Sequence, residues 1–96
     1  MRLLVFWPVL ILLSVPDVAV LYWEPGAPSY ETEEECSARL QDLEREALAN
    51  HQFLAGVRQL NSGDLPRMDF SRECITIPPR QLHEMMSRQR GPGSRT

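Results

Sequence analysis

The chain begins with an apolar run that continues into a polar, helix-forming stretch. Between residues 3 and 23, Asp17 is the single charged side chain. This stretch has about the length needed to cross the apolar core of a bilayer. Aromatic side chains lie near both of its ends, where the two membrane interfaces would be. The pattern therefore predicts a transmembrane anchor over residues 1–23.

A cleaved signal peptide is the main alternative for the same segment, and a core helix of a soluble protein is the other. Arg2 would supply the positive start and residues 3–15 the apolar centre. Small residues for cleavage are poorly placed, because cutting after Ala19 puts Asp17 at the third position before the cut. Since Arg2 favours a cytoplasmic N-terminus, the anchor and the signal peptide both place residues 24–96 outside the cytoplasm. The expected location is a bacterial inner membrane with a periplasmic C-terminus. The alternative is a secreted or periplasmic protein.

A long helix is expected after a linker at residues 24–31, where Pro and Gly oppose helix formation. Thr32 followed by Glu35 forms a capping box, a strong signal for the start of a helix. The apolar spacing then continues to Leu60, and Gly63 follows a short polar stop. The sequence therefore predicts one helix from about Glu33 to about Leu60.

The apolar positions of this helix alternate at spacings of four and three, with one Asn among them. Such a seam is typical of a coiled coil, in which a buried Asn fixes the register. It fits packing on the chain's own C-terminal segment as well as packing on a partner helix. The candidate partner-facing residues are Leu40, Leu43, Ala47, Asn50, Leu54 and Val57.

The C-terminal third carries weaker signals. Residues 65–77 are expected to be irregular or a short strand, residues 80–88 a short helix after two prolines, and residues 90–96 a disordered tail. Together with the long helix, they predict a small helical extracytoplasmic domain at residues 32–89. The expected fold class is therefore mainly α.

The two cysteines predict a disulfide. The chain contains two cysteines, Cys36 and Cys74, and it is expected to be exported. An even number of cysteines in an exported chain favours a disulfide between them. The helix from Cys36 to Asn61 would rise about 38 Å. The 13 steps back to Cys74 reach at most about 45 Å, so the bridge can just close. An intermolecular bridge and two free thiols are the alternatives.

Charge and motifs add little chemistry. Residues 24–64 carry nine acids and three arginines, whereas residues 65–96 carry three acids and six arginines. These blocks either neutralise each other or give a basic tail that favours anionic lipid or an acidic partner. No catalytic, phosphate-binding or nucleic-acid motif is present, so we expect neither an enzyme nor a nucleic-acid partner. No cofactor is expected.

Two sets of residues have side chains that bind metals, but the sequence favours neither as a metal site. A zinc site would draw on Cys36, Cys74, His51 and His83, but these lack the short ligand pair of structural zinc sites. A copper site would draw on His83, Met68, Met85 and Met86. Methionine on a short amphipathic helix is more often core filler.

One motif resembles those of many short exported bacterial proteins of unknown function. It consists of Tyr30, Thr32 and Cys36, followed by Cys74 and Pro78. In such proteins, an aromatic, a threonine and an acidic stretch precede a helix whose cysteine pairs with a second one near the C-terminus. The resemblance implies no activity. We therefore expect a non-enzymatic, membrane-anchored accessory protein that contacts a membrane complex through a helical partner. The alternative is a cleaved small protein that binds a soluble partner.

Overall fold

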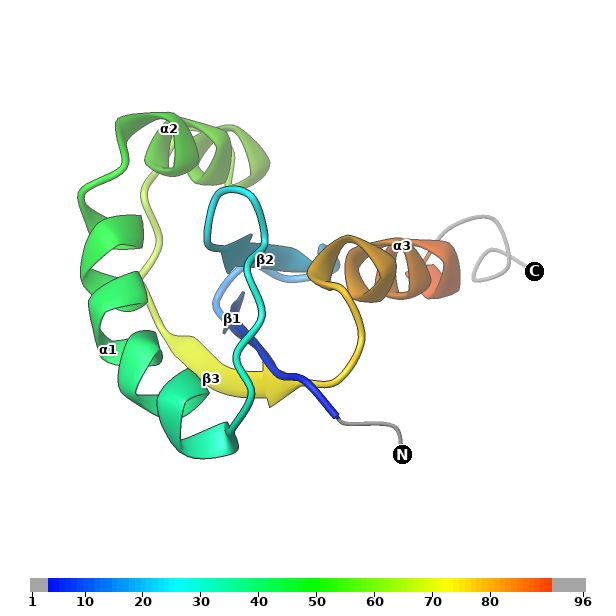
Figure 1. Cartoon of the computed structure of the whole chain (residues 1–96). Helices are drawn as coiled ribbons and strands as arrows, with labels where there is room; N and C mark the ends of the chain where they lie inside the picture. Colours follow the sequence, from blue (N-terminus) through cyan, green and yellow to red (C-terminus); the bar gives the residue numbers. More distant parts are fainter. Residues whose placement is uncertain (1–3, 91–96) are drawn as a thin grey trace.

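The fold combines a three-stranded antiparallel sheet with three helices, as Figure 1 shows in a computed structural model that describes residues 4–90. The sheet has the order β2-β1-β3. In chain order, the elements are β1 (Trp7–Leu12), β2 (Val20–Trp23), α1 (Glu33–Leu48), α2 (His51–Leu60), β3 (Phe70–Ile75) and α3 (Pro79–Arg90). The predicted mainly α fold is therefore wrong.

The N-terminal apolar run forms two strands of a hairpin instead of one helix. Pro16 and Asp17 lie in the connecting turn, and Asp17 adopts a left-handed conformation with φ 64°. Within residues 4–90, no helix has both the length and the apolar character that a membrane span requires. The predicted transmembrane helix over residues 1–23 is therefore wrong, because the turn splits the run that suggested it.

β1 is the central strand, and side chains on both of its faces are buried. It pairs with β2 on one side and with β3 on the other. Val9 and Leu10 point to opposite faces of the sheet, and both are fully buried. A strand buried on both faces has a nearly continuous apolar sequence instead of an alternating one. This burial explains why the run resembled a membrane span.

Helices α1 and α2 cover one face of the sheet, and α3 lies on the other (Figure 1). Leu10 packs against Leu40, Leu43 and Ala47 of α1. Beside this cluster lies a second buried cluster, formed by Leu12, Val15, Val20 and Val57. On the opposite face, the indole ring of Trp23 contacts the imidazole ring of His83 on α3.

The predicted helix over residues 33–60 is two helices. Its start at Thr32 is confirmed, because the Thr32 hydroxyl accepts a hydrogen bond of 3.1 Å from the Glu35 amide. Asn50 breaks the helix because its backbone is extended, with φ −92° and ψ 105°. Its Oδ1 accepts a hydrogen bond from the amide of Phe53 and caps α2, while its Nδ2 donates to the Tyr22 hydroxyl. Asn50 therefore fixes the α1–α2 joint to β2.

The C-terminal third contains one strand and one helix. β3 lies inside the stretch expected to be irregular or a short strand, and α3 includes all of the helix expected at residues 80–88. Of the predicted tail at residues 90–96, Arg90 is the last residue of α3. Residues 91–96 lie outside the described residues.

The predicted disulfide between Cys36 and Cys74 is confirmed. It joins the first turn of α1 to β3 across a sequence separation of 38 residues, with the two Cα atoms 6.1 Å apart. The Cys36 side chain is fully buried, and Cys74 packs against the cluster that holds Leu10. The bond therefore links α1 covalently to the edge strand β3.

Removing this bond should lower the free energy of unfolding by roughly 2–4 kcal/mol, because the unfolded chain regains the entropy of an open loop. Alanine at Cys36 avoids burying a hydroxyl, and serine suits the partly exposed Cys74. We expect Cys36→Ala, Cys74→Ser and the double variant to lose similar amounts in urea unfolding. A double variant that loses the sum of the two single losses would show that the cysteines act separately.

Candidate binding groove

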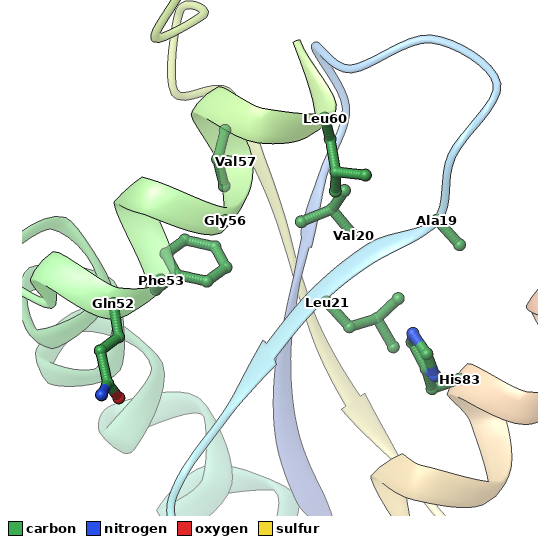
Figure 2. A pocket seen from close by; sticks show the side chains of 9 residues that line it. All are labelled: Ala19, Val20, Leu21, Gln52, Phe53, Gly56, Val57, Leu60 and His83. Atoms are coloured by element: carbon green, nitrogen blue, oxygen red, sulfur yellow. The ribbon is translucent and has the colours of Figure 1, made fainter. Parts of the chain in front are cut away.

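A groove between α2, β2 and α3 offers a concave, mostly apolar surface for binding (Figure 2). It has a cavity volume of about 240 Å³. Its apolar lining comes mainly from α2 and from the start of β2, and His83 lies at the α3 side (Figure 2). The lining residues are Ala19, Val20, Leu21, Gln52, Phe53, Gly56, Val57, Leu60 and His83.

The α2 wall combines an exposed leucine with an open glycine. Leu60 is 49% exposed although its side chain is apolar. A Cβ atom added at Gly56 would meet no atom within 4 Å, so the space above this part of α2 is empty. Phe53 supports the wall from below through an edge-on contact with Tyr22, with ring centroids 4.8 Å apart. The α2 wall is therefore mostly apolar, and part of it is exposed to solvent.

The other element of the groove, β2, is an edge strand. Within residues 4–90, β2 pairs with β1 alone, so its outer side has no neighbouring strand. The backbone groups on such a side can pair with another chain. The residues of β2 are Val, Leu, Tyr and Trp, without a charge that would discourage this pairing.

The opposite edge of the sheet differs. β3 carries Arg72 and Glu73, and charged side chains on an edge strand oppose pairing with other chains. Arg72 also donates a hydrogen bond of 2.7 Å to Glu44 on α1, and the disulfide joins the same strand to α1. Of the two edges, the one at β2 is therefore the better suited to bind.

Two polar side chains lie in the groove. Gln52 belongs to α2, and His83 belongs to α3 and packs edge-on against Trp23, with ring centroids 6.2 Å apart. His83 also lines a neighbouring hollow on α3 with Glu84, Ser87 and Arg88. The α3 side therefore offers hydrogen-bonding and charged groups, whereas the α2 side offers apolar contact.

A partly buried ion-pair network holds the linker between β2 and α1. Arg39 donates a hydrogen bond of 3.0 Å to Glu24 and forms a second ion pair with Glu46. Tyr30 donates its hydroxyl to the same Glu24 carboxylate at 2.9 Å. The network ties the end of β2 to α1, whereas the groove lies at the start of that strand.

This network shifts the protonation of its members. The hydrogen bond from Arg39 lowers the pKa of Glu24 below its ordinary value of 4.5, although burial works in the opposite direction. Burial raises the pKa of Tyr30, and the nearby Glu24 carboxylate adds to this effect. Hydrogen bonding to Glu24 raises the pKa of Arg39, so both members of the ion pair stay charged at neutral pH.

The predicted seam residues lie mostly in the chain's own core. Leu40, Leu43, Ala47 and Val57 are buried against the sheet and against one another, and Asn50 caps α2. Leu54 is half-buried and does not line the groove. Only Val57 is also a groove residue. The groove itself was not predicted, although Gly56 within a helical pattern was a usable signal because isolated helix glycines often have a packing or functional reason.

The two cysteines named as zinc ligands are not available for a metal ion. Cys36 and Cys74 are bonded to each other, so neither offers a thiolate. In the part of the chain that the structure describes, no three His, Cys, Asp or Glu side chains lie close enough together to hold a metal ion.

Comparison of the chain with protein-family models, with curated proteins and with solved structures gives no match.

Replacing Glu24 should expose the pH dependence of the ion-pair network. Since the pKa of Glu24 is lowered on folding, its stabilisation is full above pH 4.5 and is lost as pH falls through the lowered pKa. We expect Glu24→Gln to cost about 1 kcal/mol at neutral pH and progressively less as the pH falls below 4.5. Urea unfolding across this range measures the difference.

The matched control is Glu31→Gln, because Glu31 is exposed on the same linker. Its cost should be small and nearly independent of pH. Equal pH profiles for the two variants would contradict a stabilising role for the Glu24 network.

Proposed function

We propose that this protein is a non-enzymatic binding domain that holds an extended segment of a protein partner in the groove beside β2. The observation that carries the proposal is the uncharged outer edge of β2 beside an uncovered apolar wall. Extended peptides bind such edges through backbone hydrogen bonds, while neighbouring pockets select their side chains. The partner segment would become a fourth strand of the sheet.

The placement of the apolar residues supports this form of binding over a helical seam. The seam side chains of α1 are already packed on β1, so a partner helix would have to displace the sheet to reach them. The groove, in contrast, needs no rearrangement. It opens beside Leu60 and Gly56, which no other part of the described chain covers.

We further propose that the domain acts in an oxidising compartment outside the cytoplasm. The Cys36–Cys74 bond supports this location, because disulfides persist mainly in such compartments. In the folded form, β1 supplies the pairing partner of both other strands. A chain cut after Ala19 would lack β1, so the proposed binding form retains this segment.

Site-specific photocross-linking tests the proposed function. A photoreactive amino acid is placed at Leu60 in the groove, and in a separate variant at Arg45 on α1, which is 74% exposed. In cells that produce the chain, the groove position should cross-link to a defined partner segment and the Arg45 position should not. Mass spectrometry of the joined peptides identifies the segment.

The result also needs a binding control at the same site. Gly56→Met should fill the groove and abolish the cross-link, whereas Gly56→Ala should preserve it, because a single methyl group fits the open space. Cross-links that persist with Gly56→Met, or that appear equally from Arg45, would refute binding in the groove.

A further inference from the structure

The two walls of the groove differ in chemistry, and this difference bears on which partner the groove takes. A strand added beside β2 would direct alternate side chains to the two faces of the sheet. One face is covered by α2, whose groove residues are apolar except for Gln52, and the other by α3. Because Val20 and Leu21 lie on opposite faces, the two walls begin at neighbouring residues of β2.

The α2 and α3 helices are basic in a chain that is acidic overall. Their described side chains include three arginines, Arg58, Arg80 and Arg88, and one carboxylate, that of Glu84. In contrast, α1 contains six acids and two arginines, although the whole chain has a net charge of −3. An acidic ligand would therefore be attracted to the groove side and repelled from the α1 side.

The polar groups nearest to the groove are on the α3 side. His83 lies in the groove itself, and Arg88 lines the adjoining hollow on α3. Glu84 supplies the negative charge in this hollow. Arg80 lies one helical turn before Glu84 on α3. Carboxylates that point to α3 would meet donors there, whereas apolar side chains that point to α2 would meet Phe53 and Leu60.

We infer that the occupant is an extended segment of a partner protein in which apolar and acidic residues alternate. This inference rests on the proposed function and adds the sequence character of the partner. Backbone pairing to β2 holds the segment, the apolar side chains fill the space beside Gly56, and the carboxylates face His83, Arg80 and Arg88.

Fluorescence anisotropy with three labelled peptides tests this inference on the intact, oxidised chain. The first alternates valine with glutamate, and the second alternates valine with lysine. The third repeats the glutamate peptide with methylated backbone amides, which cannot donate hydrogen bonds to a strand. The glutamate peptide should bind about ten-fold more tightly than the lysine peptide. The methylated peptide should bind much more weakly than either.

Charge reversal on α3 is the second arm. Arg80→Glu combined with Arg88→Glu should remove the preference for the glutamate peptide, whereas Arg45→Glu on α1 should preserve it. Raising the salt concentration from about 0.05 M to about 0.5 M should also remove the preference for the glutamate peptide, because salt screens exposed charges. A preference that survives both changes would overturn the assignment of the carboxylates to α3.

The outcomes separate this inference from the proposed function. If both peptides bind equally and Gly56→Met abolishes both, the groove binds extended chains but the acidic preference is wrong. If neither peptide binds and the Leu60 cross-link is also absent, the proposed function fails too. Equal binding of the methylated peptide would exclude pairing to β2. If the unliganded chain is a dimer that Gly56→Met dissociates, the groove holds a second copy, and the inference is overturned.

Discussion

The packing of β1 in the centre of the sheet is the interaction on which the rest of this structure depends. This strand supplies the hydrogen-bond partners of β2 and β3, and side chains on both of its faces are buried. Each helix layer is built on one of these faces, so the positions of α1, α2 and α3 all follow from it. The disulfide then fixes α1 to β3, and the Asn50 cap fixes the α1–α2 joint to β2. The groove is the space that this arrangement leaves between α2 and α3, beside the uncharged outer edge of β2.

The features that the sequence predicts correctly are local. The capping box at Thr32 starts a helix, α3 begins at the second of two adjacent prolines, and the cysteine pair closes within the reach of the chain. Each depends on a few neighbouring residues or on chain length, and these interactions act in the same way in any fold.

The errors arise where tertiary context decides the outcome. An unbroken apolar run has the same sequence pattern in a membrane helix and in a strand buried on both faces. Pro16 and Asp17 indicate a turn, and a turn inside an apolar run is compatible with a hairpin. The hairpin becomes the favoured structure only if another strand is present to pair with β1. That strand, β3, carries Ser71, Arg72 and Glu73 in its centre, so it lacks the apolar pattern of a strand. Asn50 likewise fits both a coiled-coil seam and a helix cap, and only the position of Tyr22 distinguishes them.

Backbone protection of the amides in β1 tests the central position of this strand most directly. Native-state hydrogen exchange followed by NMR, residue by residue on the oxidised chain, measures it. The amides of Val9 and Leu10 should be among the slowest in the molecule and should exchange only through global unfolding, because a central buried strand opens last. Amides at Val9 and Leu10 that exchange as fast as those of the exposed loop at Ser62 and Gly63 would show that β1 is not the centre of the fold.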